Sequence, residues 1–133
     1  MKPSAITGLV AAACLSMSSP ALAQANVAPT QVALPADGQA STFKGEIQGH
    51  ATAEYVFQAP AGRKLQVSLK SSNEANYFNI LKDGKDDALF LGSVNGNNAV
   101  VALRDSGTYR IRVYLMRNAA RKNEAARYEL VLR

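Results

Sequence analysis

The chain has 133 residues, a formal net charge of +5, a single cysteine and a single histidine. One histidine excludes a metal site with several histidine ligands, and one cysteine excludes a disulfide within the chain. The length suits one domain, because a domain of about 110 residues buries roughly two-thirds of the surface that its unfolded chain exposes.

The N-terminus has the features of a cleavable signal peptide over residues 1–23. A positive start at Met1-Lys2 precedes an apolar stretch over residues 5–17. Ala21-Leu22-Ala23 then supplies the small-x-small pattern that signal peptidase requires, which predicts cleavage near Ala23 and export from the cytoplasm. The apolar stretch is shorter than the roughly 20 residues of a membrane-spanning helix, so no membrane insertion is expected.

An alternative for the N-terminus is lipidation of Cys14, which follows three alanines. A lipoprotein site usually has leucine three residues before the cysteine, where this chain has Ala11, and a short motif of this kind often matches by chance. Cleavage at Ala23 instead leaves a chain without cysteine, which its apolar core alone must stabilise.

Positive charge is concentrated toward the C-terminus. Loss of Lys2 with the signal peptide reduces fifteen Lys/Arg to fourteen, against ten Asp/Glu, for a net charge of +4. From Arg104 onward the chain has eight basic and three acidic residues. Such a bias is informative about partners. Nucleic acid is the usual partner of a basic patch, but export argues against nucleic acid and favours an acidic protein cleft or an anionic envelope polymer.

The segment over residues 24–40 is rich in Ala, Pro and Gln without periodicity, and we expect a flexible lead-in there. The domain then occupies residues 41–133. Alternating segments between Gly, Asn and Asp turns predict strands over 42–48, 53–58, 65–70, 77–81, 88–91, 99–103, 108–116 and 127–132. This pattern indicates a single all-β domain, an antiparallel sandwich or barrel of about eight short strands.

Catalytic sites find little support in the sequence. His50, the single histidine, lies between two predicted strands, where histidine is more often a surface or binding residue than a general base. Glu46, Glu54 and Glu74 have no spacing that singles out an acid–base pair. The aspartates within 83–87 lack the spacing of a calcium loop. We therefore expect a protein that is not an enzyme and that has no cofactor.

Two segments remain as candidate binding elements. Residues 117–126 form a charged connection with enough alanine for a helical turn but no apolar face to bury. A helical turn would place Arg117 and Arg121 on one face, and arginine binds carboxylates in a bidentate way; the simpler interpretation is a solvated loop. In the segment over 106–109, the simpler interpretation is a turn followed by a core tyrosine, Tyr109.

Five short motifs in order over about 80 residues carry a family resemblance. They are Gly45-Glu46-Ile47-Gln48-Gly49, Tyr55-Val56-Phe57, Gly62-Arg63-Lys64-Leu65-Gln66-Val67, Ser106-Gly107-Thr108-Tyr109 and Arg117-Asn118-Ala119-Ala120-Arg121-Lys122-Asn123. Together they resemble the periplasmic inhibitor of g-type (goose-type) lysozyme. The resemblance implies an antiparallel β-sandwich whose loops enter the substrate cleft of a g-type lysozyme, the expected protein partner.

The resemblance also implies which residues contact the lysozyme. The family's Ser-Gly-x-Tyr and Arg-Asn-x-x-Arg elements match Ser106, Gly107, Tyr109, Arg117, Asn118 and Arg121. The two arginines are expected near the catalytic carboxylates. A contact tyrosine in the family's first inter-strand loop corresponds to His50, which offers less apolar area.

Two other interpretations stay open at this point. The related inhibitors of invertebrate-type lysozyme share the sandwich and a similar Ser-Gly-x-Tyr element, so the arginine motif carries most of the distinction. The chain could also be a non-inhibitory module that binds envelope glycan or an anionic polymer through its basic face. Whether the free protein is a homodimer is open as well.

Overall fold

The computed structural model describes residues 28–133. The predicted signal peptide over 1–23, with the alternative lipidation site at Cys14, lies outside the described residues. The described chain forms nine strands and two short helices. They are β1 Thr30–Gln31, β2 Ser41–Gln48, β3 Ala53–Ala59, β4 Lys64–Ser71, β5 Asn76–Lys82, β6 Ala88–Leu91, α1 Gly92–Asn95, β7 Asn98–Ala102, β8 Gly107–Leu115, α2 Arg117–Arg121 and β9 Ala125–Leu132.

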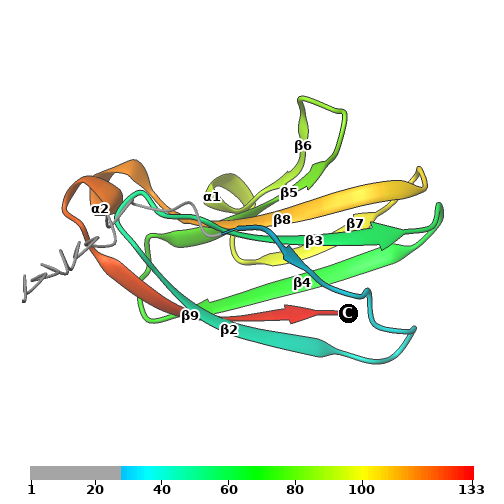
Figure 1. Ribbon diagram of the computed structural model, residues 1–133, viewed down its shortest axis with the longest axis horizontal. Coiled ribbons are helices and arrows are strands. Elements are labelled where there is room, and N and C mark those ends of the chain that lie inside the picture. The colour runs from blue at the N-terminus through cyan, green and yellow to red at the C-terminus, as the bar shows by residue number, and fades with distance from the viewer. Residues whose placement is uncertain (1–27) are drawn as a thin grey trace, which may run out of the picture.

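The strands form two sheets that pack face to face (Figure 1). The five-stranded sheet has the order β1-β3-β8-β5-β6, and the four-stranded sheet has the order β2-β9-β4-β7. Strands β2 to β9 pair antiparallel, whereas β1 runs parallel to β3. The predicted antiparallel sandwich is confirmed, and each of the eight predicted strands is present within two residues of its expected bounds.

Alternation along the strands explains the sandwich, because successive side chains of a strand point to opposite faces. In β8, Ile111 and Val113 are fully buried, while Arg110, Arg112 and Tyr114 on the opposite face are only partly buried. Alternate residues of the other long strands join them in one core between the sheets. The two-residue alternation of β8 therefore places its apolar side chains inside the sandwich and its arginines outside.

A pair of tyrosine hydroxyls lies within this core. The Tyr55 and Tyr128 hydroxyls are hydrogen-bonded to each other at 2.7 Å, so neither is left without a partner. Burial, followed by the hydrogen bond to Tyr55, raises the pKa of Tyr128 well above its ordinary value. The Tyr128 hydroxyl therefore stays neutral throughout the physiological range.

The segment before β2 differs from the expected flexible lead-in. Thr30–Gln31 adds a short parallel strand to β3, and Leu34 packs against the core. Arg63, directly before β4, binds this segment. Its guanidinium lies 2.7 Å from the Asp37 carboxylate and donates to the Pro35 carbonyl oxygen at 2.7 Å. A two-residue strand has no periodicity to detect, which is why the sequence pattern did not show it.

Helix α1 was also not predicted; it lies in the connection between the strands expected over 88–91 and 99–103. In the described part of the chain, no helix has the length and apolarity needed to cross a membrane. For the candidate site, the course of β8 matters most. It runs along the sandwich from Gly107 to Leu115, and at its C-terminal end α2 lies beside the turn between β2 and β3 (Figure 1).

Candidate functional site

Helix α2 presents the two predicted arginines on one side. Arg117 and Arg121 begin and end this one-turn helix, both are exposed, and their spacing of four residues puts them on the same face. Ala119 and Ala120, with 5% and 4% of their surface exposed, form its buried side. The expectation that this connection has no apolar face to bury was wrong, because two alanines suffice for a helix of one turn.

The chain leaves α2 through a tight reversal. Asn123 adopts a left-handed backbone conformation with φ of 56°, which asparagine tolerates better than most residues. Its N–H donates to the Ala120 carbonyl oxygen at 3.0 Å, and the Glu124 N–H donates to the Ala119 carbonyl oxygen at 3.1 Å. These bonds satisfy carbonyl groups at the helix end and hold α2 in a defined orientation.

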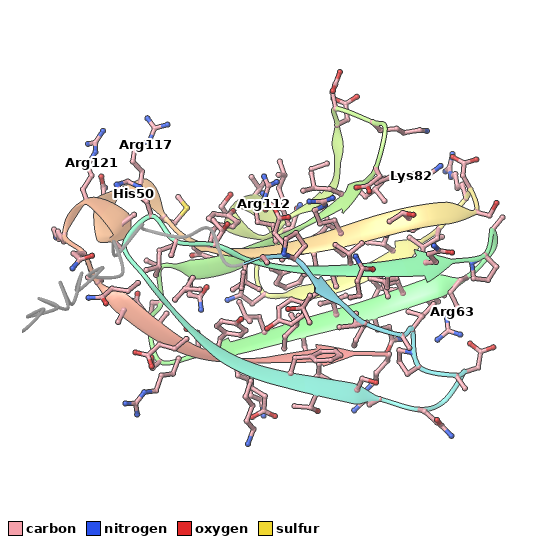
Figure 2. All side chains as sticks on the ribbon, in the orientation of Figure 1. His50, Arg63, Lys82, Arg112, Arg117 and Arg121 are labelled. Carbon is pink, nitrogen blue, oxygen red and sulfur yellow. The ribbon has the colours of Figure 1, made fainter. Side chains whose placement is uncertain are left out.

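The turn between β2 and β3 is attached to this reversal. Gly49 has φ of 60° and donates its N–H to the Glu124 carbonyl oxygen at 2.9 Å. A Cβ at Gly49 would lie 2.7 Å from Asn123 Oδ1, so glycine suits both the backbone conformation and the space. The next residue, His50, is exposed. Figure 2 shows His50, Arg117 and Arg121 together at one end of the sandwich.

An open hollow of about 530 Å³ lies between this turn and the start of α2. Its lining residues are Gly49, His50, Ala51, Thr52, Tyr114, Leu115, Met116 and Arg117. None of these eight residues is acidic, and two of them, His50 and Arg117, belong to the candidate site. The hollow can therefore accept an apolar or anionic group of a partner.

The arginines of the site differ from those of the strands. Among the described residues, the ion pairs of arginine involve Arg63, Arg110, Arg112 and Arg127 rather than those of α2. Within residues 28–133, both guanidinium groups of α2 are thus without a carboxylate partner. Such groups have their full capacity for bidentate binding to an external carboxylate.

The Ser106-Gly107-Thr108-Tyr109 element lies at the opposite end of β8. Nine residues of strand separate the two ends by roughly 25–30 Å. Figure 2 marks this far end by Lys82, whose ammonium group lies 5.9 Å from the centre of the Tyr109 ring. Ser106 and Gly107 are therefore not brought together with His50, Arg117, Asn118 and Arg121.

Tyr109 is a buried residue of the core, so its side chain is not available to a partner. Only 1% of its surface is exposed, its ring stacks near Phe57, and its hydroxyl donates to the Asp105 carbonyl oxygen. This burial argues against the expected contact between Tyr109 and a partner. The strand predicted over 108–116 already separated the two motifs, and its length was the signal that could have shown this.

Glu54, weighed as a catalytic candidate, is occupied by two arginines. Its carboxylate lies 2.7 Å from Arg112 Nε and 2.5 Å from Arg110 Nη1. Burial raises the pKa of Glu54, but the hydrogen bonds and charges of Arg112 and Arg110 together outweigh it and lower the pKa below its ordinary value. A carboxylate held ionised in this way cannot serve as a general acid near neutral pH. Among residues 28–133, no cluster of three or more His, Cys, Asp or Glu side chains could hold a metal ion.

Comparison with known proteins places the chain among lysozyme inhibitors. No protein-family model matches it. An inhibitor of g-type lysozyme from Escherichia coli (strain K12) is 34% identical over 91 residues, which are 66% of this chain and 67% of that protein. The relatives are named as inhibitors, in agreement with the expectation that this chain is not an enzyme.

Crystal structures of periplasmic inhibitors of g-type lysozyme have the same fold. The inhibitor from Aeromonas hydrophila is 29% identical with a TM-score of 0.62, covering 78% of this chain and 95% of its own. The inhibitor from Salmonella Typhimurium is 30% identical with a TM-score of 0.58, covering 78% of this chain and 96% of its own. With the fold and this sequence identity in agreement, the chain belongs to the family of periplasmic inhibitors of g-type lysozyme.

Proposed function

We propose that this protein inhibits a g-type lysozyme in the periplasm by inserting α2 into the active-site cleft of the enzyme. The observation that carries the proposal is the pair of exposed arginines, Arg117 and Arg121, on one face of a helix whose other side is buried. Asn118 is exposed between them, and His50 lies at the same end of the sandwich. Family membership supports the class of partner.

The chemistry of lysozyme explains how arginine can inhibit it. Hydrolysis of the glycan needs a carboxylic acid that donates a proton to the glycosidic oxygen. A guanidinium group beside that acid forms two charge-assisted hydrogen bonds with the carboxylate and stabilises its ionised form. The acid then lacks its proton, and the inserted helix occupies the space of the sugar. The two arginines can serve two carboxyl groups of one cleft.

Four of the residues predicted from the family resemblance stay in this proposal, and three leave it. His50, Arg117, Asn118 and Arg121 share one end of the molecule, whereas Ser106, Gly107 and Tyr109 lie at the other. Histidine at position 50 can donate a hydrogen bond or stack on a partner side chain, with less apolar area than the tyrosine of the family. We expect its contribution to be smaller than that of either arginine.

The proposal is tested by lysis of bacterial cell walls with a goose-type lysozyme. The purified exported protein is expected to stop lysis at a near-stoichiometric ratio, and Arg117→Ala and Arg121→Ala each weaken binding by about 2 kcal/mol or more if they act as buried hot spots. Arg104→Ala is the matched control, because Arg104 is an exposed arginine at the far end of β8. Unchanged lysis at a large excess of protein contradicts the proposal.

The same assay defines the lysozyme class. Run side by side with goose-, invertebrate- and chicken-type enzymes, it is expected to show inhibition of the goose type first. Retention on isolated peptidoglycan at low salt, without inhibition of any lysozyme, would instead indicate a glycan-binding module.

A further inference from the structure

Helix α2 is too small to provide the whole contact with an enzyme. It has five residues, whereas a stable interface takes about 800 Å² and 20–30 residues from each partner. The contact must therefore continue onto a surface next to α2. Two surfaces are available: the outer face of β5 and β8 in one sheet, and the outer face of β2 and β9 in the other.

The outer face of β5 and β8 carries aromatic and apolar side chains beside α2. Tyr114 pairs with Tyr77 across the two strands, so their side chains share this face. Both tyrosines are only partly buried. Met116, between β8 and α2, exposes 40% of its surface. We call Tyr77, Tyr114 and Met116 the tyrosine strip.

The tyrosine strip is continuous with the candidate site. Tyr114 and Met116 line the same hollow as His50 and Arg117. A partner group that enters this hollow thus touches the strip and the arginine helix at once. No acidic side chain lines the hollow, so an anionic group near Arg117 meets no repulsion there.

The strip is also held in place. The Tyr114 hydroxyl donates to Asn79 Oδ1 at 3.1 Å, and the Gly92 N–H at the start of α1 donates to the same oxygen at 3.3 Å. Gly92 packs so closely on β5 that a Cβ there would lie 3.3 Å from the Tyr77 Cβ and 2.4 Å from the Phe78 carbonyl oxygen. Rigid aromatic side chains lose little entropy on binding, which suits them to an interface.

The alternative surface has a different character. Beside α2, β2 and β9 expose Gln48, Glu46 and Arg127, and the last two lie 3.8 Å apart as an exposed ion pair. Interface cores are enriched in Tyr, Met and Arg and depleted in Lys and Glu. The composition of the strip fits a partner surface, and that of the β2–β9 side fits solvent.

We propose that the tyrosine strip is the second part of the lysozyme-binding surface, an inference that rests on the proposed function. The occupant is one lip of the lysozyme's substrate cleft, carrying an apolar or aromatic side chain that enters the hollow between His50 and Met116. The inhibitor then lies on the enzyme with the outer face of β5 and β8 toward it, while the outer face of β2 and β9 stays in solvent.

The test is the dissociation constant of each variant for a goose-type lysozyme, with thermal unfolding measured separately. Tyr114→Ala, Tyr77→Ala and Met116→Ala are expected to weaken binding by about 10-fold or more. Tyr114→Phe keeps the ring and should bind within about 3-fold of the wild type, since the apolar area supplies most of the contact. Glu46→Ala and Arg127→Ala, on the other side of α2, are the matched controls and should bind like the wild type.

A labelling experiment gives a second measurement that does not remove a strip residue. The exported protein without residues 1–23 contains no cysteine, so single cysteines can be modified selectively. Leu91 exposes 41% of its surface, and its partner in β5 is Asn79, so it lies next to the strip. A bulky maleimide on Leu91→Cys should weaken inhibition strongly, whereas the same group on Glu46→Cys should not.

The outcomes separate this inference from the proposed function. If the wild type fails to inhibit, or Arg117→Ala inhibits as well as the wild type, the proposed function fails and the strip has no role in it. If the wild type inhibits and Arg117→Ala weakens it, but the folded strip variants bind normally, the strip proposal is overturned while the function stands. Loss of binding in the Glu46 and Arg127 variants alone would place the contact on the β2–β9 side.

Discussion

Replacement of Tyr109 by phenylalanine tests whether the Ser-Gly-x-Tyr element stabilises the fold or binds the partner. The change removes one hydroxyl, which donates to the Asp105 carbonyl oxygen, and leaves the ring against Phe57 and below Lys82. A hydrogen bond of this kind contributes about 0.5–1.5 kcal/mol net. Because the ring is 1% exposed, no surface available to a partner changes.

The expected result is a lower melting temperature with unchanged inhibition. For a domain of this size, about 1 kcal/mol shifts the melting temperature by roughly 4–8 °C. Thermal unfolding followed by circular dichroism measures the shift, and titration of a goose-type lysozyme with the variant, well below its melting temperature, measures inhibition. Arg117→Ala is the reciprocal control, with weaker inhibition and an unchanged melting temperature, since its side chain is exposed.

The opposite pattern would refute the structural role. If Tyr109→Phe melts like the wild type but binds lysozyme at least about 10-fold more weakly, which corresponds to 1.4 kcal/mol, the tyrosine hydroxyl acts in binding. The element at the N-terminal end of β8 would then contact the enzyme, although it lies at the opposite end of the strand from α2.

Three further changes test the supports of the fold and the site. Glu54→Gln should cost about 1–3 kcal/mol of unfolding free energy at neutral pH. Because the pKa of Glu54 is lowered in the folded protein, the ionised carboxylate stabilises the fold above its ordinary pKa of 4.5, and this stabilisation is lost as the pH falls. Denaturant unfolding should therefore show that the difference in stability between wild type and Glu54→Gln vanishes in acid. Tyr128→Phe leaves the Tyr55 hydroxyl unpaired and should cost about 1–3 kcal/mol of unfolding free energy. Since the pKa of Tyr128 is raised in the folded protein, the neutral hydroxyl stabilises the fold below its ordinary pKa of 10.0, and this stabilisation is lost as the pH rises beyond that value. Unfolding measured at alkaline pH tests this loss. Gly49→Ala should cost about 1–2 kcal/mol, because alanine is strained in the left-handed conformation, and should weaken inhibition as well, since the turn that carries His50 must move; an alanine variant as stable as the wild type would contradict this account.

Much of the fold was predictable from local pattern. The alternation of Ile111 and Val113 with Arg110 and Arg112 reports directly which side chains face the core, because the period of a strand is two residues. Strand β1 was not predictable in this way, since two residues have no period. It forms by pairing with β3, more than twenty residues further along the chain, and Arg63 binds the segment that follows it at Asp37.

The candidate site was predictable only in part, for a related reason. The four-residue spacing of Arg117 and Arg121 is a local property, and a single helical turn turns it into a shared face. The burial of Ala119 and Ala120 between them was not predicted, because whether a small side chain is buried depends on what packs over it. Tyr114 and Met116 showed no signal as site residues, since they belong to the outward phase of a strand and its end.

The sequence by itself determined the strands, the basic C-terminal segment and the arginine pair, because each depends on residues that are near one another in the chain. Only the tertiary structure decided which motifs meet. Tyr109 and Arg117 are close in sequence, but the strand between them is extended and carries them to opposite ends of the sandwich. His50 is distant from α2 in sequence, and the hydrogen bond from Gly49 to the Glu124 carbonyl oxygen attaches its turn to the segment after α2. Proximity in this protein is set by pairing between chain segments, which no local pattern records.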